Sequence, residues 1–242
     1  MRAKITYVYH NCFILETGGR TMIFDYPDEE NRSGAAEDLV INALKGADAY
    51  VFFSHSHGDH CSADIMEYAD EAGSINYVLS YDVPDMVPDF EVENSIVVEP
   101  EGEEYLIGDL SISALESTDL GVAFMIRAPE GLIYYGGDLA EWTWDGIREN
   151  ELEQEQAYFE ECIGEIKKFG PDITFTNLDM RLENYGGGPK LLEMVRPKVF
   201  VPMHGFGDAP AIAKAAGKLN ARETEIFTYY KEGDSLEVDL RG

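Results

Sequence analysis

The stretch His55-Ser56-His57-Gly58-Asp59-His60 places three imidazoles and one carboxylate within six residues. It follows Ala49–Phe53, an apolar run that predicts a buried strand. Neutral imidazole nitrogens and carboxylate oxygens are ligands that zinc takes in proteins. A lone histidine is usually a hydrogen-bonded or exposed residue. Because the chain has only five histidines, three of them in one short stretch indicate a metal site rather than chance.

Four further apolar runs also end at residues that can bind a metal or carry a proton. The residues that follow these runs are Asp25, Asp138, Asp179 and His204. A sheet holds the ends of its strands rigidly, so side chains placed there can share one site. Together with the stretch after Phe53, these strand ends contain four of the five histidines of the chain. The sequence therefore indicates one site assembled from distant parts of the chain.

The rest of the chain predicts strands and helices without an internal linker or repeat. Helices are expected where apolar residues fall at helical spacing, at Ala36–Leu44, Ala63–Glu71, Leu152–Phe169, Lys190–Val195 and Ala209–Leu219. Short β-branched and aromatic runs predict strands at Ile5–Tyr9, Phe13–Leu15, Met22–Phe24, Ala49–Phe53, Tyr77–Leu79, Ile96–Val98, Leu110–Leu115, Val122–Ile126, Leu132–Tyr135, Ile173–Phe175, Val199–Val201 and near Ile226 and Leu236. We interpret this order as an α+β fold in a single domain over residues 1–242, with two sheets packed face to face and helices outside.

Composition narrows the class of partner. Of the 242 residues, 45% are hydrophobic, which is enough apolar material for a folded core. Lys and Arg number 18 against 47 Asp and Glu, giving a formal charge of −29. Binding to nucleic acid draws its affinity from cations that neutralise phosphates, so this balance argues against a nucleic-acid partner. It disfavours an anionic membrane surface for the same reason. We interpret the acidity as a solvated, self-repelling surface.

Cysteine usage and the apolar segments indicate a cytoplasmic protein. The three cysteines, Cys12, Cys61 and Cys162, are odd in number and lack the spacing of a zinc finger, which fits a reducing compartment. The N-terminal apolar run is too short and polar for a secretory signal, and no stretch reaches the length of a membrane span. Cys61 lies beside His60, and we interpret it as a small packing residue rather than a ligand or nucleophile. A monomer and a homo-oligomer are both compatible with the sequence.

Taken together, these motifs resemble those of the metallo-β-lactamase-fold hydrolases. The resemblance rests on the His-x-His-x-Asp-His stretch, on Gly137-Asp138 after a later strand, and on Pro202-Met203-His204. It spans nearly the whole chain and implies a four-layer αββα sandwich with two mixed sheets. His10 in the first hairpin and Asp25-Tyr26-Pro27 look more like the branch containing ascorbate-phosphate lactonases and N-acyl-phosphatidylethanolamine phospholipase D than like the β-lactamases proper.

The resemblance also implies a set of metal ligands. In this family pattern His55 and His57 would bind a first metal, and Asp138 would bridge it to a second one. The second metal would be bound by Asp59, His60 and His204.

One ligand of the family pattern is missing. The family usually supplies a third histidine to the first metal from the loop that here reads Glu116 to Gly121, and this loop contains no histidine. Asp119 is the strongest donor near the expected position. We therefore expect one or two zinc ions per chain, with manganese or iron as further options because the first position is richer in oxygen.

The implied activity is metal-dependent hydrolysis of a small molecule. Two cations acidify a bridging water and polarise the attacked bond, so the resemblance implies cleavage of an ester, lactone, amide or phosphodiester. Asp59, His60 and Asp138 are the candidate catalytic residues, with Asp59 orienting the water or taking its proton. Two alternatives stay open: an iron-binding oxygenase or redox enzyme on the same fold, and a non-catalytic metal-binding or ligand-binding protein.

Four residues are candidates for substrate binding. Arg181 could grip a carboxylate or phosphate beside Asp179, although a structural ion pair explains the two residues equally well. Trp142, with Trp144 close by, could form an aromatic wall of the pocket or simply pack. His10 could reach the pocket from the first hairpin or could be a hydrogen-bonded core histidine.

Overall fold

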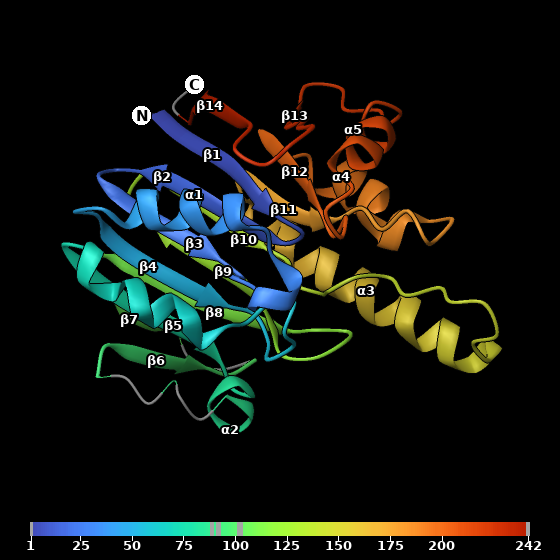
Figure 1. The fold of residues 1–242 in the computed structure, drawn as a ribbon. Coiled ribbons are helices and arrows are strands. Elements are labelled where there is room, and N and C mark those ends of the chain that lie inside the picture. The colour runs from blue at the N-terminus through green and yellow to red at the C-terminus, as the bar shows by residue number, and fades with distance from the viewer. Residues whose placement is uncertain (1, 88–89, 91–92, 101–103, 241–242) are drawn as a thin grey trace.

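The two halves of the chain form two sheets that face each other across an aromatic core. The computed structural model describes residues 2–87, 90, 93–100 and 104–240. Each sheet has seven strands, and helices cover the outer face of each one (Figure 1). The predicted order of layers, helix, sheet, sheet and helix, is confirmed.

The first sheet has the order β14-β1-β2-β3-β4-β5-β6. Its strands are β1 (Arg2–Tyr9), β2 (Cys12–Thr17), β3 (Arg20–Phe24), β4 (Asp48–Phe53), β5 (Ser74–Ser80), β6 (Ser95–Val98) and β14 (Ser235–Asp239). The β2–β3 hairpin turns at Gly18-Gly19, where both residues have positive φ, as glycine allows. Pairing is antiparallel from β14 to β3 and parallel from β3 to β6. The C-terminal strand thus returns to pair with the N-terminal one, and the two chain ends lie side by side (Figure 1).

The second sheet repeats this mixed pattern with the order β13-β12-β11-β10-β9-β8-β7. Its strands are β7 (Tyr105–Ile107), β8 (Leu110–Glu116), β9 (Val122–Ala128), β10 (Gly131–Tyr135), β11 (Ile173–Asn177), β12 (Val199–Met203) and β13 (Glu225–Ile226). Pairing is parallel from β10 to β13 and antiparallel from β10 to β7. Parallel strands end at the same edge of a sheet, which is where the polar strand-end residues gather.

Aromatic residues fill the space between the sheets. Phe24 of the first sheet stacks on Tyr135 of the second, with ring centroids 4.5 Å apart and an interplanar angle of 10°. Phe175 packs against both rings. All three side chains are fully buried. Full burial of such a side chain is worth roughly 1.5–3 kcal/mol, so this contact fixes the two sheets against each other directly beneath the strand ends.

Helices on both outer faces complete the layers. The first sheet is covered by α1 (Gly34–Leu44) and the 3₁₀ helix η2 (Ala63–Glu71), and the second by α3 (Glu149–Phe169) and α4 (Gly188–Val195). The remaining short helices are η1 (Glu29–Asn31), α2 (Val83–Met86), η4 (Tyr185–Gly187) and α5 (Ala209–Ala216). Only the C-terminal half of α3 has buried residues, Phe159 to Phe169, and its N-terminal half extends away from the sheets (Figure 1).

Some local details go beyond the sequence predictions or differ from them. The helix expected at Ala63–Glu71 is confirmed with the same bounds and is a 3₁₀ helix; Ile65 is its one buried residue, so no apolar stripe holds it in the α form. Strand β7 was not expected from the sequence because it is short and its central Leu106 is 75% exposed. Helix α5 stops at Ala216, three residues before the expected end.

No described helix is both long and apolar enough to cross a membrane. The three cysteines are buried with free thiols, and Cys61 packs in the apolar cluster between the first sheet and its helices. Burial raises the pKa of the Cys61 thiol, which opposes formation of the reactive thiolate.

A buried ion pair that joins the sheets provides a test of this packing. Arg20 on β3 is 7% exposed and its guanidinium pairs with Glu130, 5% exposed, in the β9–β10 turn and with Asp109 in the β7–β8 turn. Arg20→Gln leaves the Glu130 charge buried without its partner. We expect it to lower the free energy of unfolding by about 3–5 kcal/mol, measured by urea denaturation.

The matched control for this variant is Arg2→Gln. Arg2 pairs with Glu237 at 3.8 Å, but both side chains are exposed. Exposed pairs contribute little, so a change within about 0.5 kcal/mol is expected. Equal losses in the two variants would contradict the role given to Arg20.

Candidate metal centre

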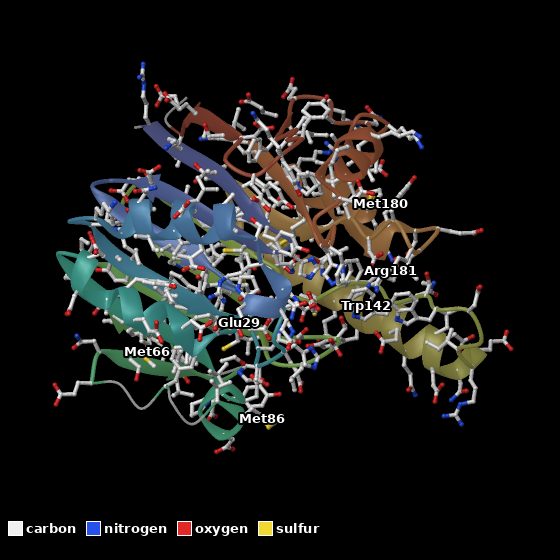
Figure 2. The ribbon with its side chains drawn as sticks, in the orientation of Figure 1. Glu29, Met66, Met86, Trp142, Met180 and Arg181 are labelled. Carbon is white, nitrogen blue, oxygen red and sulfur yellow. The ribbon has the colours of Figure 1, made fainter. Side chains whose placement is uncertain are left out.

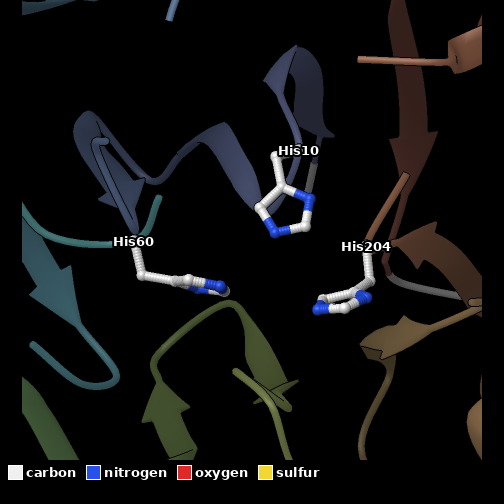
Figure 3. A group of neighbouring side chains, drawn as sticks. All are labelled: His10, His60 and His204. Carbon is white, nitrogen blue, oxygen red and sulfur yellow. The ribbon is translucent and has the colours of Figure 1, made fainter. Parts of the chain in front are cut away.

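All five histidines of the chain converge on one point at the edge of the two sheets. His55, His57 and His60 lie in the loop after β4, His10 lies in the β1–β2 turn, and His204 follows β12. The His10, His60 and His204 rings turn toward a common space (Figure 3), and one nitrogen from each lies within 4.8 Å of the others. The fold therefore assembles the site that the strand ends predicted.

A first group of donors consists of His55, His57 and Asp119. The Nε2 atom of His55 lies 3.1 Å from the Nδ1 atom of His57. Two nitrogens bound to one tetrahedral zinc lie roughly 3.3 Å apart, given Zn–N bonds of about 2.0–2.1 Å. The Oδ2 atom of Asp119 is 3.8 Å from His57 Nδ1. The Asp119 carboxylate therefore lies close enough to these two histidines to be a candidate third donor.

A second group of donors lies around His60. The Nε2 atom of His60 is 3.8 Å from Asp59 Oδ2 and 3.5 Å from Asp138 Oδ2. The Nε2 atom of His204 is 3.4 Å from the same Asp138 oxygen. That oxygen is also 3.9 Å from His55 Nε2 in the first group. A single carboxylate oxygen of Asp138 therefore faces both groups of histidines.

Buried carboxylates orient two of these rings from behind. The Nδ1–H of His60 donates to Asp25 Oδ2 at 2.8 Å, and the Nδ1–H of His204 donates to Asp179 Oδ2 at 3.1 Å. These contacts turn the Nε2 atom of each ring toward the site, where it would offer its lone pair to a metal once any proton on it is displaced. His60 Nε2 is buried without a hydrogen-bond partner. The donor set and this unpartnered nitrogen fit a divalent cation.

Asp25 has a role that the sequence did not predict. Its carboxylate accepts hydrogen bonds from Ser54 N (2.8 Å), Ser54 Oγ (2.6 Å), Tyr135 Oη (2.7 Å) and His60 Nδ1. With these four donors it holds His60 in place rather than offering a free oxygen to a metal. Ser54 Oγ in turn lies 3.0 Å from His55 Nδ1 and aims that ring into the site. The position of Asp25 directly after β3 was the only signal in the sequence.

His10 is held in a tautomer that makes it a donor. Its Nδ1 atom accepts a hydrogen bond from the backbone N–H of Phe206 at 3.1 Å. Burial lowers the pKa of His10 to about 4, so the ring is neutral at pH 7 and its proton is on Nε2. This Nε2–H lies 3.5 Å from Asp59 Oδ2. His10 therefore directs an N–H group at Asp59, although its ring lies among potential metal ligands.

The histidines and carboxylates of the centre shift one another's pKa values. Burial disfavours the charged form of His60, but the carboxylates of Asp138, Asp25 and Asp59 outweigh it and raise its pKa to about 9. Burial likewise opposes ionisation of Asp138, yet the surrounding imidazoles, His60 first, hold its pKa well below the usual range. Burial lowers the pKa of His55 to about 4. In the metal-free protein a proton on His60 thus supplies part of the positive charge that a cation would bring.

Two glycines beside the candidate ligands allow two loops to approach Ser54 closely. Gly121 has φ +70°, and a Cβ atom there would lie 2.1 Å from the carbonyl oxygen of Ser54. Gly137 has φ +49°, and a Cβ atom there would lie 2.6 Å from Ser54 Cβ. These glycines let the Asp119 loop and the Asp138 turn pack directly on the start of the histidine loop.

Two of the four predicted substrate-binding residues, Trp142 and Arg181, line a pocket of about 380 Å³ together with Asp59, Asp119 and Asp138. His10 is not among the described residues that line it. Asp179 has another role, because its buried carboxylate is held by His204 and Arg181. It orients these two side chains and has no surface for a substrate.

The sequence and fold were compared with known proteins. Residues 4–146 match the family model of the Beta-lactamase superfamily domain. A protein named a metal-dependent hydrolase from Pyrobaculum arsenaticum is 26% identical over 253 residues, covering 97% of this chain and 100% of that protein. The similarity therefore extends over the full length of the relative.

Two solved structures share the fold. A metallo hydrolase from Ignicoccus hospitalis matches with a TM-score of 0.64 at 16% identity, covering 98% of this chain and 99% of the other. A diiron β-hydroxylase from Streptomyces venezuelae matches with a TM-score of 0.60 at 12% identity, covering 98% of this chain and 54% of the other. At these identities the two structures show a common fold alone.

The carboxylate of Asp25 should control metal affinity without binding the metal. Asp25→Asn removes the anionic acceptor that orients His60, and we expect metal affinity to fall about tenfold to a hundredfold. Tyr135→Phe removes one donor and leaves the carboxylate, so its loss should be smaller. Competition with a chromophoric chelator measures both, and equal affinities in Asp25→Asn and wild type would contradict this role.

Metal affinity should also depend on pH. Below a pKa of about 9 His60 carries a proton that the metal must displace. The apparent association constant should therefore rise at least about tenfold per pH unit between pH 6 and pH 9 and level off above. Chelator competition at each pH, corrected for protonation of the chelator, measures this slope. A constant affinity across the range would be inconsistent with a protonated His60.

Proposed function

Because the chain belongs to the β-lactamase superfamily as a metal-dependent hydrolase, we propose that its metal centre cleaves an ester, lactone, amide or phosphodiester bond in a small molecule. The observation that most directly supports this proposal is the position of Asp138 Oδ2, which faces His55 on one side and His60 and His204 on the other. This arrangement supports two adjacent cation positions that share one carboxylate. Zinc suits the imidazole-rich donor set.

Each ligand has a place in this proposal. His55, His57 and Asp119 would hold the first cation, Asp59, His60 and His204 would hold the second, and Asp138 would be available to both. Bound divalent cations would supply an acidified water and polarise the attacked bond. The residues of this chain position the reactants: Asp138 is fixed by a hydrogen bond from Asn11 Nδ2 at 3.2 Å, and Asp25 and Asp179 fix the histidines.

Asp59 is the group proposed to orient the attacking water and take its proton. Burial opposes its ionised form, but His10 and His60 outweigh burial and keep its pKa below the usual range. The carboxylate is therefore ionised at neutral pH and can accept a proton. The Nε2 atom of His10 lies 3.5 Å from one Asp59 oxygen and is close enough to favour its ionised form.

The charge of the protein supports a small substrate. A formal charge of −29 repels polyanions such as nucleic acids. The pocket of about 380 Å³ lies within the range of small-molecule sites.

A second candidate is iron-dependent redox chemistry on the same fold. Asp119 in the third position makes the first donor group richer in oxygen than three histidines would, and carboxylate oxygen suits manganese and iron. The Streptomyces venezuelae protein, which shares this fold over 54% of its chain, is a diiron hydroxylase. Metal analysis after anaerobic purification separates the two: stoichiometric iron with oxygen uptake would replace the hydrolase proposal.

Removing ligands should abolish both metal binding and turnover. In a panel of aryl esters, lactones, amides and phosphodiesters, we expect the zinc-loaded protein to hydrolyse members of at least one class. His55→Ala and Asp138→Ala should each lose bound metal and at least about a hundredfold in rate. Asp85→Asn, an exposed acid on α2, is the control and should retain both. Full metal content in both ligand variants, with no turnover by wild type, would overturn the proposal and favour a non-catalytic binding protein.

A further inference from the structure

One arginine lies at the mouth of the pocket, among acids. Arg181, in the segment after β11, is the one Arg or Lys among the described residues that line this pocket. The lining also includes four carboxylates, Asp59, Asp119, Asp138 and Glu155. Figure 2 shows Arg181 and Trp142 close together beside α3. A lone guanidinium in this position offers a single attachment point for an anionic group.

The guanidinium is fixed by Asp179 along one edge. Arg181 Nε donates to Asp179 Oδ1 and Oδ2, both at 3.0 Å, and Nη2 donates to Oδ2 at 2.6 Å. The Oδ1 atom of Asp179 also accepts a hydrogen bond from the backbone N–H of Arg181 at 2.8 Å. Within the described part of the chain, Nη1 makes no hydrogen bond. The edge formed by Nη1 and Nη2 therefore retains protons for a second, two-pronged acceptor.

Aromatic rings fix the plane of the same guanidinium. Its central carbon lies 4.4 Å from the Phe206 ring centroid and 5.0 Å from the Trp144 ring centroid. Trp144 stacks on Trp142, with centroids 5.6 Å apart and an interplanar angle of 7°. Phe206 and Trp144 are 46% and 41% exposed, so apolar ring surface beside the cation remains uncovered. We call Trp142, Trp144, Arg181 and Phe206 the clamp.

We propose that the clamp binds a substrate carboxylate through the Nη1–Nη2 edge of Arg181, while the flat apolar body of the substrate covers Trp144 and Phe206. The inference rests on the proposed function and narrows the substrate class to small monoanions. In such a substrate the bond to be cleaved lies at the end of the apolar body opposite the carboxylate. Trp142 lies 5.5 Å from the His204 ring, so the clamp adjoins the metal centre directly.

Charge selects a carboxylate over a phosphate monoester. The guanidinium of Arg181 is already paired with the Asp179 carboxylate, which is the main cause of its raised pKa, and the carboxylates of Asp138 and Asp59 contribute to the rise. A bound monoanion adds one negative charge to this pair. A dianion would place an additional negative charge against acids that already surround the pocket.

Intrinsic fluorescence gives a direct binding test. The chain has two tryptophans, and both belong to the clamp. Benzoate, its neutral counterpart methyl benzoate, and phenyl phosphate are titrated into zinc-loaded protein. We expect saturable quenching by benzoate at concentrations about tenfold or more below those needed for the other two probes. Equal binding of benzoate and methyl benzoate would overturn the proposal, and tighter binding of phenyl phosphate would assign the clamp to phosphates instead.

Variants separate the clamp from the metals, which can also attract a carboxylate. Arg181→Gln should weaken benzoate about tenfold to a hundredfold, the range of a lost charge-assisted contact, and leave methyl benzoate unchanged. Arg148→Gln, an exposed arginine at the start of α3, should change neither. Metal content and thermal midpoint are measured for each variant. Unchanged benzoate binding in a folded, metal-loaded Arg181→Gln protein would show that the metals, not the clamp, hold the anion.

Steady-state kinetics with matched substrates test whether the clamp contributes to turnover. With 4-carboxyphenyl acetate and its methyl ester as matched substrates, Arg181→Gln should raise KM for the acid alone and leave kcat similar. Because the fluorescence arm needs no turnover, inactive protein that binds benzoate through Arg181 would refute the proposed hydrolase and retain the clamp. Active protein that treats both substrates alike would refute only the clamp.

Discussion

The buried carboxylate of Asp25 is the contact on which the arrangement of the centre depends. It follows β3 in the first sheet, and it accepts hydrogen bonds from Ser54 after β4, from Tyr135 in the second sheet and from His60. An uncompensated buried charge is costly, so all of these donors must be in place together. The backbone of Asp25 has φ +44°, a conformation that is uncommon outside glycine and persists where surrounding contacts fix it. One residue thereby fixes the distance between the sheets and the direction of a metal ligand.

The centre contrasts with the rest of this acidic molecule. All five histidines are drawn into a space bordered by Asp59, Asp119 and Asp138, and Asp25 and Asp179 bind two of the rings from behind. Opposite charges at short range account for the raised pKa of His60 and the lowered pKa of Asp138. The overall charge of −29 is therefore a property of the surface, and the chemistry is set by a small, locally compensated cluster.

Substrate recognition follows from this contrast. Inside a negative protein, Arg181 is the one Arg or Lys among the described residues that line the pocket, and it lies next to the proposed metal centre because Asp179 contacts both Arg181 and His204. A small monoanion can engage Arg181 and still reach the centre, whereas a polyanion meets repulsion over the rest of the surface. Asp179 connects the two sites of recognition, because its carboxylate orients both His204 and Arg181.

The sequence by itself determined the layers of the fold and the residue types of the centre. Apolar runs of strand length and the histidine stretch after Phe53 are local signals, since strand burial and ligand chemistry are properties of the residues themselves. The family resemblance indicated Asp119 as a candidate donor, and the apolar run before Asp25 placed that residue at the site without predicting its supporting role. Ser54 and Asn11 received no role. Tertiary structure decided those roles, together with the tautomer of His10, the support function of Asp179 and the free edge of Arg181. Each depends on which groups approach across sheets and loops, and hydrogen-bond partners that are distant along the chain leave no local pattern to read.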